Sequence, residues 1–562
     1  IIGVRGELQT PWTEGMNFRN LEDNGFIKFD FLGLTLLKDV ENCIRRILER
    51  DTGKEPTFLE IRDWFDAKLN CRYVEQDDIK VWQHVYHQRR KVGVFQFTAE
   101  GARRFCEDAK PTSIEELGAL TAIYRPGPLR ANVHLKYVKD KKRADDIEYA
   151  HPIIKEILGS TFGHVTFQEQ FMLLAQKLGG FTPAESDKLR KTLVKKSLDT
   201  MGKKGDEREA ARNKFVKGAK EINGVPEHVS QELWERIEFF SVYGFNKSHA
   251  VAYAIGSYYA AWLHTYYETD WLSTILESEN NNPKNLSKAI SEIKAMGYEV
   301  STHDVNESGL SWNWSENKKA FIPPLNSIKG LGKNAVREIM ANRPYENLEQ
   351  MLYDEKGKWY HSKLNKTGFA ALCKVEALDT LEEMWNGTIN NHRQLHEIVI
   401  ANYDKLKKSK FGMTLRQAAK KEADPILPQL IEETCDIDDW NRIEKLQMYQ
   451  DMCSATRDDL AFPEGLMNKI MSSGVKSVLK FEPHEKSIGW FCVVETIKRT
   501  TKNKKIFYRV KITDNESNTG WLRIWGQIPE ELQPYTIWLT ETKNDPNWGC
   551  STSSRKIRPL VV

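Results

Sequence analysis

The chain has 562 residues, of which 40% are hydrophobic and 29% are charged. At about 150 residues per domain, this length predicts three to four domains, and the composition excludes a disordered or fibrous protein. No apolar run approaches the roughly 20 residues that a membrane-spanning helix needs. The longest apolar stretch (250–263) also lacks the cationic flank of a signal sequence. We therefore expect a cytoplasmic protein with no membrane partner.

The eight cysteines contain no C-x-x-C pair, which argues against a zinc ribbon, a redox motif or a disulfide framework. The net charge is only +3, so a nucleic-acid partner must be argued from local clusters of charge. The sequence starts at Ile1 and has no methionine before Met16. We expect it to be the C-terminal part of a longer protein.

A strand is predicted in IKFDFLGL (27–34), where alternation places Phe29 and Phe31 on the face opposite Asp30. A carboxylate between large aromatic residues is a setting in which a metal ligand can be held rigidly. An aspartate that caps a helix or pairs with a cation would give the same pattern. One carboxylate alone does not make a metal site.

Helices dominate the next part of the chain. A helix over 34–50 has an apolar stripe formed by Leu36, Leu37, Val40, Ile44 and Leu48. The pattern from about 56 to 275 is mostly helical, and it is interrupted only by short glycine and proline signals. The asparagine cluster at 278–286 predicts a domain boundary.

The C-terminal half contains two further patterns. A glycine hairpin that opens a helix is predicted at 328–340, and a similar helix follows at 364–378. Alternating apolar and polar residues predict strands at 487–501, 505–515 and 520–526. Several short strands within about 75 residues indicate a small β-barrel. Charged amphipathic helices without a chemical signature lie between these regions.

The segment 188–220 is a concentrated basic run, with twelve lysines and arginines against four acidic residues, Asp199, Asp206, Glu207 and Glu209. Such a field suits a polyphosphate or a nucleic-acid backbone. A solvated helix face would carry the same pattern.

Two other polar groups are candidates for binding phosphate. Lys247 and His249 lie at the predicted start of a long helix, and a helix N-terminus with adjacent cations favours phosphate. Arg125 lies in YRPGPL, which we interpret as an irregular turn stiffened by proline. A structural histidine would equally explain His249. No P-loop, G-x-S-x-G or H-E-x-x-H motif is present, so ATPases, hydrolases and zincins lose support.

Several of these segments, in this order, resemble the alpha subunits of bacterial replicative DNA polymerase III, which form polymerase family C. The resembling blocks are KFDFLGL (28–34), VFQF with EGARRF (94–105), ELGALTAIYRPGPL (116–129), FQEQ to TLVKK (167–196), YGFNKSHAVAYA (243–254), VNESG (305–309) and IKGLG (328–332).

The resemblance implies a multidomain α+β fold with mainly helical fingers, a helix-hairpin-helix element and a C-terminal OB-fold barrel. The expected divisions are a palm remnant (1–45), the fingers (46–290), the end of the fingers with the helix-hairpin-helix region (291–383), a helical connecting region (384–486) and the OB-fold (487–562).

The resemblance also assigns roles to residues. Asp30 would be one of three aspartates that bind Mg²⁺ in the palm. The other two, with a PHP domain, would lie on an upstream segment. The incoming deoxynucleoside triphosphate would be contacted by Arg125, Arg190, Lys191, Lys195, Lys196, Lys247 and His249. The family usually has paired arginines at Arg190 and Lys191, and lysine lacks the bidentate fork of arginine. This departure suits a divergent, phage-type member.

Primer-template DNA would be bound by two elements. The hairpin would contribute Lys329, Gly330, Gly332 and Lys333, and the barrel would contribute Lys498, Arg499, Lys504 and Arg523. The barrel also carries six aromatic residues, Trp490, Phe491, Phe507, Tyr508, Trp521 and Trp525. Half of them must face the barrel core by alternation, so only the remainder can stack on bases.

The function implied is template-directed addition of deoxynucleotides to a primer 3′ end by two-metal phosphoryl transfer. Partners would include a sliding clamp and other replisome subunits. We expect this fragment alone to be inactive, because the first two palm aspartates are absent from it. The alternative is a non-catalytic, polymerase-derived subunit that binds DNA.

Overall fold

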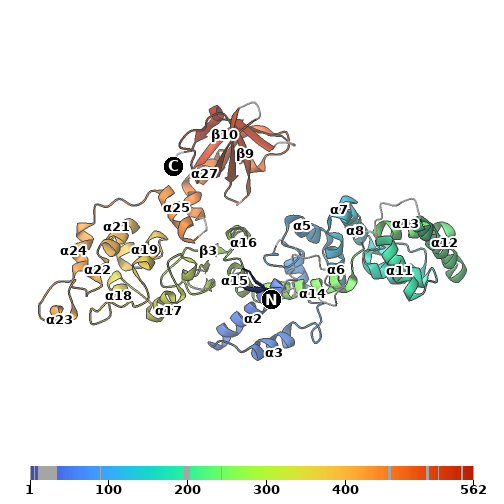
Figure 1. The fold of residues 1–562 in the computed structure, drawn as a ribbon, viewed down its shortest axis with the longest axis horizontal. Coiled ribbons are helices and arrows are strands. Elements are labelled where there is room, and N and C mark those ends of the chain that lie inside the picture. Colours follow the sequence, from blue (N-terminus) through green and yellow to red (C-terminus); the bar gives the residue numbers. More distant parts are fainter. Residues whose placement is uncertain are drawn as a thin grey trace.

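The computed structural model describes residues 2–4, 7–9, 34–88, 90–194, 203–241, 244–453, 457–501, 505–516, 518–545 and 549–560. These residues form an elongated helical body and a separate β-rich unit, which stands on the body near its middle (Figure 1). Asp30, Lys195, Lys196 and Lys504 lie outside the described residues, as does most of the expected palm remnant. Before residue 34, the structure describes an antiparallel pair, β1 (Ile2–Val4) and β2 (Glu7–Gln9).

The predicted helix over 34–50 is α2 (Thr35–Thr52). Leu36, Val40 and Ile44 are buried as expected, but the prediction was wrong for Leu37, whose exposed fraction is 48%. The buried stripe of α2 follows Leu36, Asp39, Val40, Cys43, Ile44 and Ile47, and Leu37, about 100° from Leu36, lies at its exposed side.

The helical region after α2 is built from the elements expected of a mainly helical fingers domain. They are α3 (Phe58–Lys68), α4 (Ile79–Val81), the π-helical turn Trp82–Tyr86, α5 (Glu100–Ala109), α6 (Ile114–Ile123), α7 (Pro126–Arg130), α8 (Val133–Lys141), α9 (Pro152–Leu158), α10 (Gln168–Lys177), α11 (Pro183–Val194), α12 (Lys203–Asn223), α13 (Glu227–Ser241), α14 (Lys247–Tyr266), α15 (Glu268–Ser278) and α16 (Pro283–Ala295). Helices α9 to α13 share a core of their own, at the end of the body on the right in Figure 1.

Helix α14 is the axis of the central part. It packs tightly on α6, because Gly118 brings the two backbones together: a Cβ at that position would lie 3.5 Å from the carbonyl carbon of Ala250. The middle of α14 is buried in two hydrophobic cores. Its two ends are therefore held in fixed positions, and both ends carry polar side chains.

A small sheet and two helical hairpins follow α16. The sheet contains β3 (Glu299–Val300), β4 (Asn313–Ser315) and β5 (Ala320–Ile322), and the helices are α17 (Lys333–Asn342), α18 (Leu348–Leu352) and α19 (Lys366–Lys374). The loop before α17 contacts the first turn of α19: a Cβ at Gly330 would lie 3.3 Å from Thr367 Cγ2. The predicted pair of similar motifs is therefore one packed unit.

Short helices continue to the β-rich unit. They are α20 (Glu382–Trp385), α21 (His392–His396), the π-helical turn Glu397–Ala401, α22 (Tyr403–Leu406), α23 (Leu415–Ala418), α24 (Ile426–Glu433), α25 (Arg442–Cys453), α26 (Asp458–Ala461) and α27 (Glu464–Ser472).

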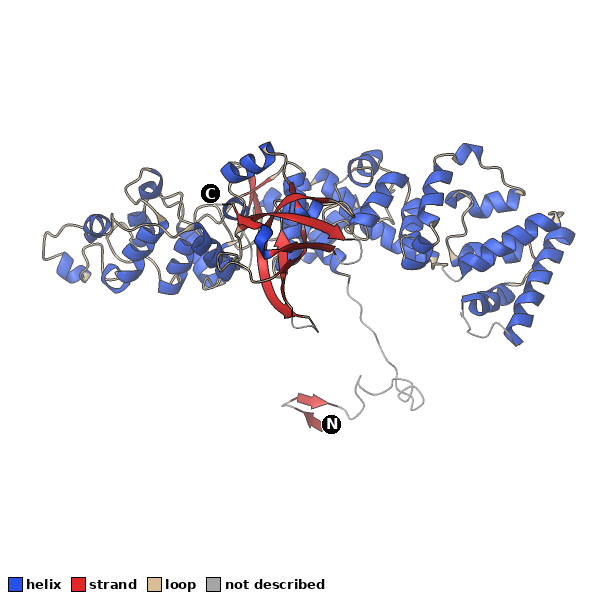
Figure 2. Cartoon of the chain, turned by 90° about the horizontal axis from the view of Figure 1, so that it is seen from above, coloured by secondary structure: helices blue, strands red, loops and turns tan. Residues whose placement is uncertain are grey.

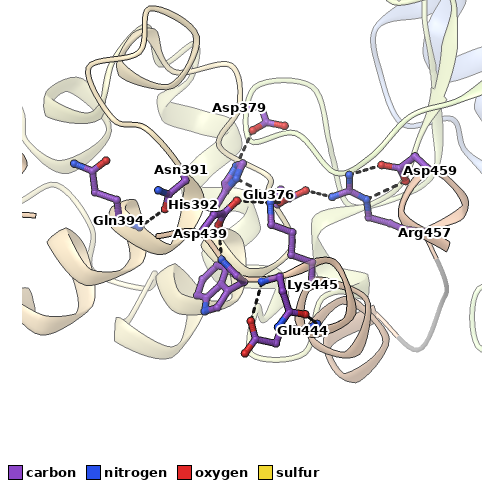
Figure 3. Close-up of polar contacts among 12 residues, drawn as sticks. Glu376, Asp379, Asn391, His392, Gln394, Asp439, Glu444, Lys445, Arg457 and Asp459 are labelled. Atoms are coloured by element: carbon purple, nitrogen blue, oxygen red, sulfur yellow. Dashed lines mark hydrogen bonds and ion pairs between the residues drawn. The ribbon is translucent and has the colours of Figure 1, made fainter. Parts of the chain in front are cut away.

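A buried ion-pair network ties this region to the hairpins (Figure 3). Glu376, in the turn after α19, pairs with Arg457, with Lys445 of α25 at 2.8 Å and with His392 at 3.5 Å. Burial raises the pKa of Glu376, but the neighbouring cations lower it further, so the net shift is downward. The carboxylate is therefore held in its charged form between two cations.

The predicted β-barrel is confirmed, as is the multidomain α+β fold. Five strands, β7 (Lys486–Thr500), β8 (Ile506–Thr513), β9 (Thr519–Trp525), β10 (Ile537–Asp545) and β11 (Gly549–Ser553), close into a barrel in the order β7-β8-β9-β11-β10, and β10 pairs back with β7. The strands β6 (Lys476–Ser477) and β12 (Ile557–Pro559) extend the sheet. Seen from above, the strands gather over the middle of the helical body (Figure 2).

None of the helices in the described ranges is long and apolar enough to cross a membrane.

Candidate nucleotide and nucleic-acid interface

The start of α14 brings together three of the predicted nucleotide-binding residues. The guanidinium of Arg125 lies 4.5 Å from the ring centroid of Phe245, and the His249 ring lies 5.4 Å from the same phenyl ring. The ammonium of Lys247 lies 5.7 Å from the ring of Phe167, which bridges to Phe245 through the backbone. Three cationic or titratable side chains therefore surround one aromatic pair at a helix N-terminus.

Arg125 is held by the helix that follows it. The predicted irregular turn is instead the start of α7, where Pro126 takes the first helical position and Arg125 is the N-cap. Its Nε donates to the carbonyl of Ala122 at 3.1 Å. Burial lowers the pKa of Arg125, but a guanidinium stays protonated in proteins. The positive charge of Arg125 is therefore held in a fixed position and partly shielded from solvent.

The N-terminus of α14 already holds a carboxylate. The amide N–H of Lys247 donates to Oε2 of Glu169 at 2.9 Å, and the Asn246 side chain donates to Oε1 at 3.1 Å. The ammonium of Lys247 pairs with Glu115. The site thus binds anionic oxygens in the manner expected of a phosphate site, with two protein carboxylates in that role. Glu115 and Glu169 could not be predicted from the sequence, because only the fold brings them to this helix end.

The basic run 188–220 has more acidic partners than its own sequence contains. Arg190 and Lys191 both pair with Asp187, each at 2.8 Å, and Lys214 pairs with Glu185 at 2.6 Å. These two acidic residues lie just outside the segment 188–220. The interpretation that only four acidic residues oppose the run was therefore wrong. Asp187 lies one helical turn before Arg190 and Lys191 on α11, and the packing of α11 on α12 brings Glu185 to Lys214.

Arg190 and Lys191 lie apart in the sequence from Arg125, Lys247 and His249, which we name the Lys247 cluster. They lie on α11, which packs on α10, and the first turn of α10 supplies Glu169 to the start of α14. Helix α10 is therefore the physical link between the two predicted groups. In the structure, the cations of α11 are bound to Asp187 rather than to the Lys247 cluster.

The first hairpin loop exposes the predicted glycines and lysines. Lys329, Gly330, Gly332 and Lys333 are all exposed. Gly330 has φ of +97°, which favours glycine, whereas Gly332 caps α17 with an ordinary φ of −76°. Among the described residues, the amide N–H groups of Gly330 and Gly332 have no acceptor. Such groups can bind phosphate oxygens without reading base sequence.

The outer face of the barrel carries alternating aromatic and cationic side chains. Facing pairs across β8 and β9 are Phe507 with Trp525, Arg509 with Arg523 and Lys511 with Trp521. The rings of Phe507 and Trp525 lie 5.1 Å apart, and Arg509 lies 4.5 Å from the ring of Trp521. We name these six residues the barrel face. Exposed aromatic rings beside cations are typical of surfaces that bind single-stranded nucleic acid.

The predicted division of the six barrel aromatics is confirmed only in part. Phe491 and Tyr508 belong to the barrel core, whereas Trp490 is buried against α27 in a separate cluster. Trp521 and Trp525 are 41% and 37% exposed. Of the predicted cations, Arg523 belongs to the barrel face, and Arg499 lies beside it, opposite Phe507. Lys498 lies opposite Tyr508 and therefore points to the other side of the sheet. Arg509 and Lys511 were missed, although they follow the same alternation.

Comparison with known proteins gives two family matches. Residues 43–223 match the bacterial DNA polymerase III alpha subunit finger domain, and residues 297–386 match a helix-hairpin-helix motif.

Individual relatives match a longer part of the chain. The DNA polymerase III subunit alpha of Aquifex aeolicus is 34% identical over 375 residues, which cover 66% of this chain and 30% of the relative. The Borreliella burgdorferi subunit is 33% identical over 425 residues, covering 75% and 34%. The Vibrio cholerae subunit is 30% identical over 369 residues, covering 64% and 30%. The chain spans about a third of the length of these relatives.

Proposed function

The chain belongs to the family of bacterial DNA polymerase III alpha subunits, and we propose that it forms the nucleotide-holding and template-holding part of a replicative DNA polymerase. The reaction would add deoxynucleotides to a primer 3′ end and release pyrophosphate. The observation that carries this proposal is the cluster of Arg125, Lys247 and His249 at the start of α14, within a finger domain.

The cluster would bind the triphosphate of the incoming nucleotide. The start of α14 offers backbone N–H groups, and Lys247 and Arg125 offer positive charge in a partly buried setting where electrostatic interactions are strong. A triphosphate would replace Glu169 at the amide of Lys247 and Glu115 at its ammonium. Arg190, Lys191, Lys195 and Lys196 would add charge from α11 and the residues after it.

The DNA would be held by two surfaces of different chemistry. The hairpin loop would bind duplex phosphates through the amides of Gly330 and Gly332, with Lys329 and Lys333 beside them. The barrel face would bind the single-stranded template through its aromatic rings, with Arg499 at its edge. The helix-hairpin-helix match supports the first surface.

Mg²⁺ remains the expected cofactor, with Asp30 as one ligand. Bound Mg²⁺ would lower the pKa of the primer hydroxyl and neutralise the leaving group. This part of the proposal rests on the sequence resemblance, because Asp30 is outside the described residues. The remaining ligands would come from an upstream polymerase segment, which we propose as a partner together with a sliding clamp and other replisome subunits.

The test uses the polymerase reconstituted from this chain and the upstream segment. Lys247→Ala should raise the KM for deoxynucleotides by about tenfold or more, because a hydrogen bond to a charged group contributes about 1.5 to 3 kcal/mol. Lys288→Ala removes an exposed lysine of α16 that lies 3.8 Å from Glu292 and serves as the matched control. An unchanged KM in Lys247→Ala would remove the α14 site from nucleotide binding. If reconstitution gives DNA binding but no synthesis, the non-catalytic alternative is correct.

A further inference from the structure

The opposite end of α14 carries a second polar cluster that the polymerase function does not use. His264, near the end of α14, Glu268, which opens α15, and His84, on the π-helical turn, place one ligand atom each within 4.8 Å of one another. His84 Nε2 lies 3.6 Å from Glu268 Oε1, and His264 Nδ1 lies 3.4 Å from the same oxygen.

These separations match the coordination shell of a tetrahedral metal. Zinc binds imidazole nitrogen at about 2.0 to 2.1 Å and carboxylate oxygen at about 2.0 to 2.2 Å, so tetrahedral ligands lie about 3.3 to 3.4 Å apart. Both separations from Glu268 are close to that spacing. The third separation, between the ligand nitrogens of His84 and His264, is at most 4.8 Å. The His84 side chain is 28% exposed, so its ring has room to rotate and shorten this separation.

The histidines also lack the partners that a purely structural role would provide. His264 has an exposed fraction of 0%, and among the described residues neither of its ring nitrogens has a hydrogen-bond partner. Nε2 of His84 is likewise buried without a hydrogen bond in this part of the chain. Buried polar atoms are usually satisfied, and an unsatisfied one calls for a water or an ion.

The surroundings of Glu268 suit a ligand carboxylate. Arg90 Nη1 donates to Oε1 at 2.7 Å, and the Tyr298 hydroxyl donates to Oε2 at 2.7 Å. Carboxylates that bind metals are commonly hydrogen-bonded in this way, and each oxygen has more than one lone pair. Arg90 alone could also neutralise Glu268 with no metal present. That reading leaves the ring nitrogens of His264 unsatisfied.

We infer that His84, His264 and Glu268 form a site for a zinc-class divalent transition metal, with an open fourth position for water. Two histidines and one glutamate are a ligand set used by zinc. The metal would join the π-helical turn to the junction of α14 and α15, and would thereby fix the end of the helix whose start holds the Lys247 cluster. The site uses none of the residues of the proposed Mg²⁺ site and does not depend on the polymerase proposal.

The test titrates the untagged full chain, stripped with a chelator, with Zn²⁺ and with Co²⁺. We expect one Zn²⁺ per chain in competition with a chromophoric chelator, the intense visible absorption of tetrahedral Co²⁺, and a higher thermal midpoint with Zn²⁺. His84→Gln should weaken binding by at least about tenfold and abolish the Co²⁺ band. This variant leaves the Arg90–Glu268 pair intact, so its midpoint without metal should equal that of the unaltered chain.

His228→Gln is the matched control, because it removes an exposed histidine of α13 that lies outside the cluster. It should bind Zn²⁺ as the unaltered chain does. Glu268→Gln should also lose the Co²⁺ band, and its circular dichroism spectrum reports whether it folds. Equal affinity in His84→Gln and the unaltered chain, or an unaltered chain that takes up no Zn²⁺, would overturn the inference.

Discussion

The amide N–H of Lys329, in the first hairpin loop, donates to the backbone carbonyl of Met452 on α25 at 2.8 Å. The same helix reaches the barrel, because Arg442 Nη2 donates to the carbonyl of Tyr535 at 3.3 Å. One helix therefore contacts both the hairpin loop and the barrel, although Tyr535 is not part of the barrel face. This arrangement fixes the distance between a surface suited to duplex phosphates and a surface suited to unpaired bases.

The network around Glu376 should be essential for stability. Glu376→Gln would remove the carboxylate that Arg457 and Lys445 share, but each cation keeps a second acidic partner, Asp459 and Asp439 respectively. The cost should therefore be below the roughly 3 to 5 kcal/mol of an uncompensated buried charge. We expect a loss of about 1 to 3 kcal/mol in the free energy of unfolding, measured by urea denaturation. Lys486→Ala breaks the exposed pair with Glu541 and should change it by less than about 1 kcal/mol. Equal effects in the two variants would contradict the structural role of the network.

The two glycines of the hairpin loop should respond differently to alanine. Gly330→Ala places a Cβ at φ of +97° and 3.3 Å from Thr367 Cγ2, so it should destabilise the hairpin by about 1 kcal/mol or more and weaken duplex binding. Gly332→Ala has an ordinary φ and open space around its Cβ, so the thermal midpoint should hardly change. Fluorescence anisotropy with a labelled duplex and a thermal melt test both variants. A larger effect at Gly332 would show that the loop is not held as described.

The barrel face should bind single strands with a measurable salt dependence. Arg523→Ala removes a cation that lies 5.6 Å from the ring of Phe507, and it should weaken binding of a single-stranded oligonucleotide and lower the salt slope by about one. Arg558→Ala removes the same charge from β12, on another part of the barrel, and should have a smaller effect. If both variants bind alike at every salt concentration, the barrel face is not the binding surface.

A buried histidine should make the contact between the small sheet and α25 sensitive to acid. His303 Nε2 forms a hydrogen bond with Ser327 Oγ at 3.0 Å, and His303 Nδ1 forms one with the Tyr449 hydroxyl at 3.3 Å. Burial, assisted by the charge of Arg457, lowers its pKa from 6.5 to about 3. As the pH falls, His303 is therefore protonated at a higher pH in the unfolded chain than in the folded chain. The contribution of His303 to stability should be constant above pH 6.5 and decrease by up to about 1.4 kcal/mol per pH unit between pH 6.5 and 3.

Hydrogen exchange of the α25 amides at pH 7.5 and 5.5, corrected for the intrinsic rate, measures this effect. His303→Gln keeps a polar side chain and removes the titration, so its protection should depend less on pH. His228→Gln should behave as the unaltered chain does. The same pH dependence in all three proteins would exclude His303 as its source.

The periodic parts of the fold could be predicted from the sequence. Alternation in 487–526 gave three barrel strands and separated buried Phe491 from exposed Trp521, because strand faces follow a period of two. Contacts between distant segments could not be predicted this way. Glu115 and Glu169 reach Lys247 only through the packing of α6 and α10 against α14, and no local pattern in the sequence encodes that packing.

In the absence of a ligand, the carboxylates of Glu115 and Glu169 neutralise the positive charge at the start of α14. A single inorganic anion that binds at the start of α14 must displace Glu169 from the amide of Lys247 and Glu115 from its ammonium. It has few atoms with which to form replacement contacts. A ligand with several linked phosphates can replace both groups at once. Internal competition of this kind would set a threshold that depends on the number of charges a ligand presents together.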